Sequence, residues 1–167
     1  MIVRAPDGTY EFIDFRETAP AAAFENMYKD NEAASLVGGL ASGVPGELRG
    51  LQHLHNNYGR LPWSTVLLPA VNVARQGWLV NQDLVSYMDS AISSAGQNAT
   101  SNFLVDDLEF ALDFAPHGRL LKLNETITRK RYADTLETVA LEGPGVFYEG
   151  SFVRSVLSSV DSTLTNL

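Results

Sequence analysis

The strongest pattern in this sequence is an apolar period of three to four residues between glycines and prolines. Residues 46–58 show it most clearly, because large apolar side chains recur there at helical steps: Leu48, Leu51, Leu54 and Tyr58. Such spacing forms one apolar stripe along a helix. Gly59 follows directly, where a glycine in the left-handed conformation commonly ends a helix. We therefore predict an amphipathic helix over residues 46–58 with Gly59 as its C-terminal cap.

The same period predicts further helices on both sides of this one. Upstream, we expect a helix from Pro20 to Lys29 with Thr18 as its N-cap, because proline is favoured in the first helical turn. Downstream, an apolar face runs from Pro62 to Ala74. Pro69 lies inside that face and removes one backbone hydrogen bond, so the region would be either a kinked helix or two short helices, ending at Gly77.

Three more helices are expected toward the C-terminus. One starts after Asn81, one runs from Thr128, as its cap, to Leu141, and the last contains Phe152 to Val160. The inward side chains of the helix that ends at Leu141 would be Tyr132, Leu136, Val139 and Ala140. Residues 103–114 mix aromatic and acidic side chains without a clean period, so helix and extended chain both remain open for them.

Two short strands are expected before the first helix. Ile2–Arg4 and Thr9–Ile13 flank the sequence Ala5-Pro6-Asp7-Gly8, which is typical of a tight turn. Together with the helices, this hairpin predicts an α+β fold that is predominantly α-helical: a short N-terminal β-hairpin followed by about six helices. With 167 residues and 45% hydrophobic side chains, the chain is long enough for one domain or a large part of one.

The charge balance excludes several classes of partner. The formal net charge is -8 and the isoelectric point is near 4.7. A surface of this charge repels the phosphates of nucleic acids and of anionic membranes. No apolar run approaches the roughly 20 residues that span a bilayer, and no signal peptide or anchor is expected at the N-terminus. We therefore expect neither nucleic-acid binding nor membrane contact from this segment.

The sequence offers few residues for metal or redox chemistry. Cysteine is absent, which excludes disulfides, thiolate zinc sites and a cysteine nucleophile. His53 and His55 point about 200° apart around the predicted helix, so they cannot bind one metal together. His117 is isolated, and no His-Glu-x-x-His motif occurs. Residues 38–47 are rich in glycine but match neither phosphate-binding glycine motif, so close backbone packing is their expected role. No metal and no cofactor are therefore expected.

Two Asn-x-Thr triplets bear on the cellular compartment. Asn98-Ala99-Thr100 and Asn124-Glu125-Thr126 fit the acceptor sequence for N-glycosylation, with no proline in the middle. Either triplet can also arise by chance. Together, Asn98 and Asn124 favour a eukaryotic protein of the secretory pathway, whether extracellular, at the cell surface or vacuolar.

Arg16 is the candidate ligand-binding residue of the N-terminal region. It lies where the predicted strands give way to the predicted helix, within Ile13-Asp14-Phe15-Arg16-Glu17-Thr18-Ala19-Pro20. A guanidinium at such a junction can bind a ligand carboxylate with two parallel hydrogen bonds, and it stays charged at any biological pH. A solvated surface arginine, or an internal ion pair with Asp14 or Glu17, is the alternative.

Several short sequence motifs are distributed over nearly the whole chain. After residues 13–20 they are Gly38-Gly39-Leu40-Ala41-Ser42-Gly43-Val44-Pro45-Gly46-Glu47, Tyr58-Gly59-Arg60-Leu61-Pro62-Trp63, Leu67-Leu68-Pro69-Ala70, Ala74-Arg75-Gln76-Gly77-Trp78, Tyr132-Ala133-Asp134-Thr135-Leu136-Glu137 and Glu142-Gly143-Pro144-Gly145-Val146-Phe147-Tyr148. In this order they resemble the heavy (large) subunit of the γ-glutamyltranspeptidase family. With the two sequons, the sequence is most similar to a fungal member.

This resemblance implies a predominantly helical fragment of the αββα N-terminal-nucleophile (Ntn) hydrolase fold, with residues 1–167 as a single partial domain. It further implies a zymogen that cleaves itself, after which the new N-terminal threonine of the small subunit attacks the γ-glutamyl amide of glutathione. The glutamyl group then passes to water or to an amino acid or peptide. Such chemistry needs the threonine hydroxyl, an amine as its base and donors for the oxyanion.

One site residue is carried over from the family. Arg16 matches the arginine that binds the α-carboxylate of the γ-glutamyl group, with Asp14 and Glu17 as supports or ion-pair partners. No catalytic residue is expected within residues 1–167, because no Gly-Thr-Thr processing site occurs and the small catalytic subunit is absent, so the fragment should be inactive alone. The implied partners are glutathione, other γ-glutamyl compounds and the small subunit of the same precursor.

Two competing hypotheses remain. One is a related acylase that acts on other glutaryl-like amides. The other is a non-catalytic helical interaction domain of a secreted glycoprotein, in which Arg16 is structural.

Overall fold

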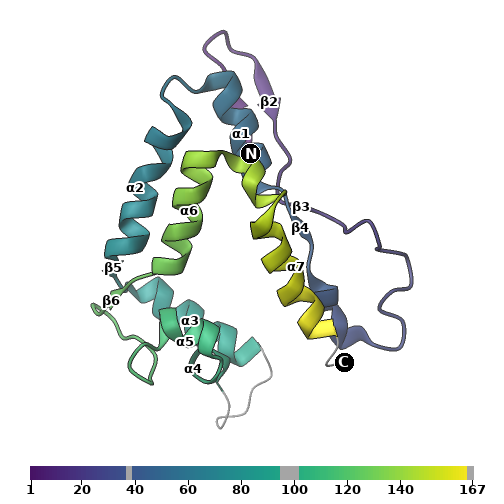
Figure 1. Cartoon of the computed structure of the whole chain (residues 1–167), viewed down its shortest axis with the longest axis vertical. Coiled ribbons are helices and arrows are strands. Elements are labelled where there is room, and N and C mark those ends of the chain that lie inside the picture. The colour runs from purple at the N-terminus through teal and green to yellow at the C-terminus, as the bar shows by residue number, and fades with distance from the viewer. Residues whose placement is uncertain (37–38, 95–101, 165–167) are drawn as a thin grey trace. The chain divides into compact units, whose positions relative to one another are not determined.

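The computed structural model describes residues 1–36, 39–94 and 102–164. Within these residues seven α-helices form (Figure 1): α1 (Glu47–Tyr58), α2 (Trp63–Gln76), α3 (Gln82–Ser94), α4 (Phe103–Asp106), α5 (Leu108–Phe114), α6 (Lys130–Glu142) and α7 (Ser151–Leu164). Three short 3₁₀ helices accompany them: η1 (Glu32–Ser35), η2 (Gly39–Ala41) and η3 (Pro144–Phe147). The strands pair antiparallel in twos: β1 (Ile2–Arg4) with β2 (Tyr10–Phe12), β3 (Glu17–Thr18) with β4 (Val44–Pro45), and β5 (Trp78–Leu79) with β6 (Thr126–Ile127).

The chain folds as two compact units. The first unit contains Met1–Trp63 and Val139–Leu167, and the second contains Ser64–Thr138. That residues 1–167 form a single partial domain stays a prediction. Among the residues that the structure describes, no helix has both the length and the apolar character needed to cross a membrane.

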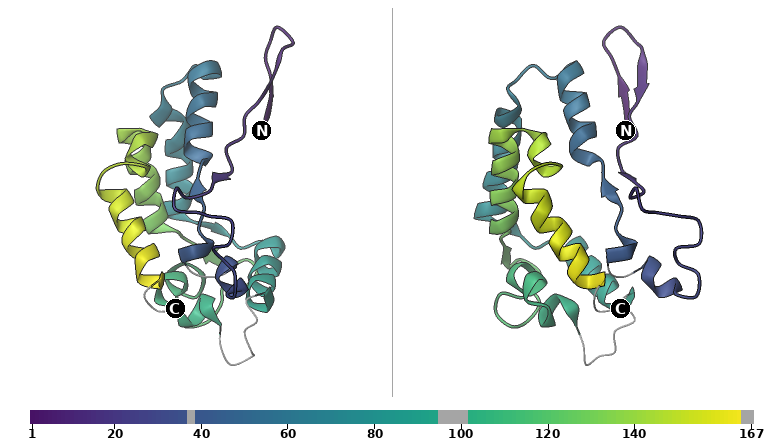
Figure 2. Two further views of the ribbon diagram at one scale, coloured as in Figure 1. Left: turned by 90° about the vertical axis from the view of Figure 1, so that its right-hand side faces the viewer. Right: turned by 45° about the vertical axis from the view of Figure 1, so that its right-hand side comes forward.

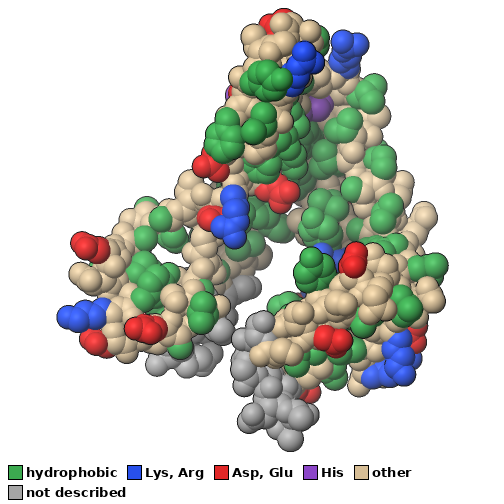
Figure 3. All heavy atoms as spheres, turned by 180° about the vertical axis from the view of Figure 1, so that it is seen from behind, with side chains coloured by type: hydrophobic (Ala, Val, Ile, Leu, Met, Phe, Trp, Pro, Cys, Tyr) green, Lys and Arg blue, Asp and Glu red, His purple; other side chains and the backbone are tan. Residues whose placement is uncertain are grey.

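The predicted N-terminal hairpin is present in the first unit. β1 and β2 pair in a register that sets Ile2 opposite Phe12 and Arg4 opposite Tyr10. Asp7 fixes the turn between them, because its Oδ1 accepts the Thr9 N–H at 2.9 Å. Large apolar side chains reach the surface in many places (Figure 3). On the hairpin, Ile2, Tyr10 and Phe12 are each exposed to 70% or 71%, so this face has no cover among the described residues.

The helix predicted from Pro20 to Lys29 does not form. These residues make a series of turns whose hydrogen bonds span three residues, such as Ala23 N–H to the Pro20 carbonyl. The large apolar side chain of Phe24 is 66% exposed. A helix of this length is marginal in water unless it buries a well-packed apolar face. Thr18 pairs in β3 with Val44 and therefore caps no helix.

The helix over residues 46–58 is confirmed as α1, but the predicted cap is wrong. Gly59 has φ -71° and ψ 145°, an extended conformation, and its N–H donates to the His55 carbonyl at 2.7 Å. The chain then runs extended towards α2, so no left-handed residue is needed. Glycine fits at position 59 for another reason, since a Cβ there would overlap the His55 carbonyl oxygen.

The second unit is built around two apolar clusters. In the first, α2 and α6 lie side by side (Figure 1), with Val71, Ala74 and Ala133 buried and Leu136 packed against them. α2 is one continuous helix with the exposed Pro69 inside it, so the alternative of two short helices is wrong. The helix ends before Gly77, as predicted.

The second cluster is next to the β5–β6 pair, and it includes Ile127 of β6. Its buried members are Val80, Leu121 and Ile127, and Leu84, Val85 and Phe114 pack against them. α3 starts after Asn81 as predicted, because Asn81 Oδ1 accepts the Leu84 N–H at 2.9 Å.

Residues 103–114, which the sequence left open, form α4 and α5. Each short helix starts at a side-chain cap: Asn102 accepts the Leu104 N–H, and Asp107 accepts the Glu109 N–H. The second cap restarts the helix after one turn, so neither segment is long enough to show a clean apolar period.

α6 starts two residues after the predicted cap Thr128. Its first turn is closed by the Arg129 carbonyl, which accepts the Ala133 N–H at 2.8 Å. Tyr132 was predicted to point inward, but it is 44% exposed and lies under the Arg129 guanidinium, whereas Ala133 is fully buried. Val139 and Ala140 are buried as predicted.

α6 ends at Glu142, one residue after the predicted end at Leu141. Gly143 has φ 89°, a left-handed conformation that favours glycine, and η3 follows it. The Phe147 and Phe152 rings, 5.2 Å apart, join η3 to α7. α7 then runs back through the first unit to η2 (Figure 2).

Candidate functional site

Arg16 lies immediately before β3, at a junction between strands rather than at the predicted strand-to-helix junction. Its carbonyl accepts the Gly46 N–H at 3.2 Å, and Glu17 pairs with Pro45 on β4. The backbone on the C-terminal side of the Arg16 Cα is therefore fixed to the segment that leads into α1.

The Arg16 side chain extends into solvent. It is 86% exposed, and its Nη1 donates to Glu17 Oε1 at 2.5 Å. Among the described residues, Glu17 is the one acceptor in contact with this guanidinium. A guanidinium has five N–H donors. The structure thus contains the ion pair that the sequence offered as an alternative, and it leaves most of the Arg16 donors available to a ligand.

A hollow of about 290 Å³ lies beside Arg16. Arg16, Asp14 and Glu47 supply its charged side chains, and Met1, Ile13 and Phe15 complete it. Asp14 is exposed and lies two residues from Arg16.

Close packing of Phe15 on α1 holds the Arg16 segment in place. Gly50 is buried, and a Cβ at that position would overlap the Phe15 ring. A Cβ on Gly46, one turn earlier, would come within 2.7 Å of the Phe15 carbonyl oxygen. The two glycines lie four residues apart on one helix face, so their spacing lets the chain approach the helix backbone.

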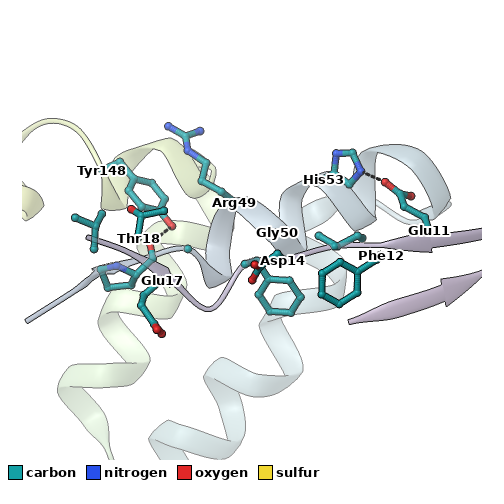
Figure 4. Close-up of a pocket in the computed structure, with 14 residues that line it drawn as sticks. Glu11, Phe12, Asp14, Glu17, Thr18, Arg49, Gly50, His53 and Tyr148 are labelled. Carbon is teal, nitrogen blue, oxygen red and sulfur yellow. Dashed lines mark hydrogen bonds and ion pairs between the residues drawn. The ribbon is translucent and has the colours of Figure 1, made fainter. Parts of the chain in front are cut away.

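A larger pocket of about 650 Å³ follows the same segment along α1. Its walls come from residues 11–18, β4, α1 and Tyr148. Figure 4 shows Arg49 and Tyr148 together at one end and His53 and Glu11 at the other.

Glu11 connects the hairpin to α1 at its end of this pocket. Its two carboxylate oxygens accept hydrogen bonds from Tyr58 Oη at 2.6 Å and His53 Nε2 at 2.5 Å (Figure 4 shows the second). Two hydrogen bonds lower the pKa of Glu11: the one from Tyr58 has the larger effect and the one from His53 the smaller. The same hydrogen bond to Glu11 raises the pKa of Tyr58. This cluster anchors β2 on the helix.

The histidines of α1 have separate protein partners. His53 contacts Glu11, whereas His55 Nε2 lies 2.8 Å from the Leu61 carbonyl and its ring meets Trp63 edge-on. Within the described residues, no group of three or more His, Asp or Glu side chains is arranged to hold a metal ion.

Of the two sequons, only that of Asn124 falls within the described residues, and Asn98 lies outside them. Asn124 is exposed in the loop before β6, with φ 66°, and its N–H donates to the Val80 carbonyl at 2.9 Å. The next residue, Glu125, accepts two hydrogen bonds from Arg119, at 2.7 and 2.9 Å. This paired contact, together with the hydrogen bond from the Lys122 N–H, lowers the pKa of Glu125 to about 2. The Asn124 side chain is therefore accessible on a well-anchored loop.

Comparison with known proteins identifies the family. A sequence model of the family described as Gamma-glutamyltranspeptidase matches residues 1–164. The chain belongs to the γ-glutamyltranspeptidase family. It is 52% identical over 160 residues to a glutathione hydrolase proenzyme of Arthroderma benhamiae, which covers 96% of this chain and 26% of that protein. It is 46% identical over 160 residues to a glutathione hydrolase of Aspergillus flavus, covering 96% of this chain and 25% of that protein.

A solved γ-glutamyltranspeptidase has the same fold. The enzyme from Pseudomonas nitroreducens, complexed with L-DON, superposes with a TM-score of 0.80 at 33% identity, over 98% of this chain and 46% of that chain. The predicted family and the Ntn-hydrolase fold class are thus confirmed. The chain spans about a quarter of the length of the curated relatives.

The sequence did not predict two contacts around Arg16 and the larger pocket, those of Glu11 with Tyr58 and of Tyr148 with Pro45. Glu11 was predicted only to lie in a strand, and Tyr148 was noted only as the last residue of the sequence motif at residues 142–148. The four-residue spacing of Gly46 and Gly50 did carry a signal, since it predicts close backbone approach to one face of α1.

Proposed function

We propose that this chain is part of the large subunit of a γ-glutamyltranspeptidase that hydrolyses glutathione. The complete enzyme would cleave the γ-glutamyl amide of glutathione and of other γ-glutamyl compounds, and it would transfer the glutamyl group to water, an amino acid or a peptide. The observation that carries this proposal is the family match over residues 1–164, together with relatives named glutathione hydrolase.

Within that enzyme, Arg16 would bind the α-carboxylate of the γ-glutamyl donor. Its backbone is fixed by the Gly46 N–H, and its 86% exposed side chain contacts only one acceptor among the described residues. A planar guanidinium can therefore offer a carboxylate two parallel hydrogen bonds while Glu17 holds another of its N–H groups. The carboxylate-binding role proposed for Arg16 from the sequence is thus retained, although Arg16 lies between strands and not before a helix.

The nucleophile would come from outside this segment. We expect it to be the N-terminal threonine of a small subunit cleaved from the same precursor, in line with the word proenzyme in the name of a relative. Residues 1–167 alone would then bind donors weakly and show no turnover. No cofactor is needed for this acyl transfer.

The test is the Arg16→Lys variant of the enzyme expressed from the complete reading frame. We expect KM for a γ-glutamyl donor to rise about 10- to 100-fold, because lysine replaces two charged hydrogen bonds with one. Arg154→Lys, an exposed position on α7, is the matched control and should leave KM unchanged. An unaltered donor KM in Arg16→Lys would refute the role of Arg16.

We also propose that the enzyme enters the secretory pathway and carries glycans at Asn98 and Asn124. The exposed Asn124 side chain supports the second of these sites. Secreted protein from a fungal host should gain mobility on a gel after endoglycosidase treatment, and each of Asn98→Gln and Asn124→Gln should remove part of that shift. A host-expressed protein whose mass equals that of the bare polypeptide would refute the proposal.

A further inference from the structure

A hydrogen bond between distant segments lies directly behind Arg16. Tyr148 Oη donates to the Pro45 carbonyl at 2.8 Å, across 103 residues of sequence. Pro45 belongs to β4, the strand that pairs with β3 next to Arg16. Tyr148 directly follows η3, the 3₁₀ helix that lies within the sequence motif at residues 142–148.

β4 has two edges, and Arg16 and Tyr148 occupy opposite ones. On one edge, the Gly46 N–H donates to the Arg16 carbonyl at 3.2 Å. Successive residues of a strand direct their backbone groups to alternate sides, so the Pro45 carbonyl points away from β3. Proline has no N–H to lose at that outer edge. The Tyr148 hydroxyl satisfies the one acceptor that Pro45 presents there.

Tyr148 is itself held in a defined orientation. The Arg49 guanidinium of α1 lies over its ring, 4.7 Å from the centroid, and Figure 4 shows the two side chains together. Arg49 also contacts Glu149 at 3.9 Å. The Phe147 ring meets the Tyr148 ring edge-on at 5.2 Å. These contacts fix the hydroxyl against β4 at little further entropic cost.

The β3–β4 ladder is short. Only two residue pairs define it, Glu17 with Pro45 and Thr18 with Val44. In so short a ladder, a hydrogen bond on the outer edge limits how far the inner edge can move. A shift of about 1 Å at a binding group can cost a large part of its effect.

We propose that Tyr148 is a positioning residue for the Arg16 guanidinium, acting through the Pro45 carbonyl and the β3–β4 ladder. This inference rests on the proposed function, in which Arg16 binds the donor α-carboxylate. It assigns a role to the sequence motif at residues 142–148, whose last residue, Tyr148, contacts β4 next to Arg16.

The experiment uses the enzyme expressed from the complete reading frame, with the variants Tyr148→Phe and Arg49→Leu. Tyr148→Phe removes only the hydroxyl, and Arg49→Leu removes the group that lies over the ring. KM for the γ-glutamyl donor should rise about 2- to 10-fold in Tyr148→Phe, the range expected for one neutral hydrogen bond, with kcat within about twofold. Arg49→Leu should raise KM in the same direction.

Tyr28→Phe is the matched control. Tyr28 Oη also donates to a backbone carbonyl of the first unit, that of Leu40, at 2.7 Å, but Leu40 is not in the β3–β4 ladder. Its loss should leave the donor KM unchanged. An equal rise of KM in Tyr28→Phe, or an unchanged KM in Tyr148→Phe, would overturn the positioning role.

Two further measurements separate this inference from the proposed function. With an amide of 4-aminobutyrate, a donor that lacks the α-carboxylate, wild type and Tyr148→Phe should have the same KM. In the double variant Arg16→Lys/Tyr148→Phe, the second substitution should add little to the first. If Arg16→Lys raises KM and Tyr148→Phe adds its full effect on top, Tyr148 does not act through Arg16. If Arg16→Lys alone changes nothing, the proposed role of Arg16 fails, and the positioning role fails with it.

Discussion

Arg16 differs from the arginines of the second unit. All four arginines of the second unit contact a carboxylate from elsewhere in that unit: Arg75 with Asp134 and Glu137, Arg119 with Glu125, Arg129 with Asp113, and Arg131 with Glu109. Arg16, in the first unit, contacts only its sequence neighbour Glu17 and is 86% exposed.

The side chains of the second unit's arginines connect structural elements. Arg16 is instead held in place through its backbone, and most of its N–H donors face solvent. The arginines of the second unit link separate segments of the chain, as Arg75 of α2 does with Asp134 and Glu137 of α6. The Arg16 segment is instead held by the Phe15 ring on α1 and by the β3–β4 ladder. A fixed backbone with a guanidinium that is mostly exposed to solvent is the arrangement expected of a ligand-binding arginine.

The second unit should lose most stability when its apolar cluster is opened. Ile127 is 1% exposed, so Ile127→Ala should lower the free energy of unfolding by about 2–5 kcal/mol. Leu79→Ala, on the paired strand but 62% exposed, is the control and should have a much smaller effect. Urea denaturation measures both. Similar losses in the two variants would mean that the cluster does not dominate the second unit.

The first unit should depend on the close approach of Phe15 to α1. Gly50→Ala should cost about 1–3 kcal/mol, because the added Cβ overlaps the Phe15 ring in a packed contact. Gly145→Ala adds the same atom where no other atom lies within 4 Å, and it serves as the control. A Gly50→Ala variant as stable as wild type, by thermal unfolding, would contradict the packing described for the Arg16 segment.

The second unit should also lose stability in acid through the Arg119–Glu125 pair. The hydrogen bonds from Arg119, and after them the one from the Lys122 N–H, lower the pKa of Glu125 from its ordinary 4.5 to about 2, so the folded state favours the ionised carboxyl. The contribution is complete above pH 4.5 and disappears as the pH falls towards 2. Arg119→Gln should raise the pKa of Glu125 towards 4.5 and flatten this part of the stability curve. NMR titration of the Glu125 carboxyl checks the pKa, and a value of about 2 in the variant would sink the explanation.

The smallest change in stability is expected at Arg16. Arg16→Gln removes one exposed ion pair between neighbouring residues, so the free energy of unfolding should stay within about 0.5 kcal/mol of wild type. Chemical denaturation of wild type and variant, side by side, measures this difference. A clear loss of stability would place Arg16 with the structural arginines of the second unit.

The sequence predicted the elements whose signals are local. The helix over residues 46–58, the start after Asn81 and the N-terminal hairpin each depend on a continuous apolar pattern or a capping side chain close by. The failures also have local causes. Pro20–Lys29 has helical spacing, but its Phe24 stays 66% exposed, and Gly59 is required by the nearby His55 carbonyl rather than by a left-handed turn.

The site was predictable only in part. Arg16 was found through the resemblance to a family and not through its own spacing, which also fitted an ion pair with Glu17. The contacts of Glu11 with Tyr58 and of Tyr148 with Pro45 join residues 47 and 103 positions apart. No periodicity of a single chain encodes a pairing over such separations, so these contacts required the folded structure.

The bond from Tyr148 to Pro45 also has a consequence for the order of folding during synthesis. β3 and β4 can pair as soon as Gly46 has left the ribosome, but their outer edge then has to wait for residue 148. At about 5–20 residues per second, the delay over 103 residues is roughly 5–20 s. For that time the nascent chain carries the Arg16 strand without its brace, and a polypeptide that terminates before Tyr148 never acquires it.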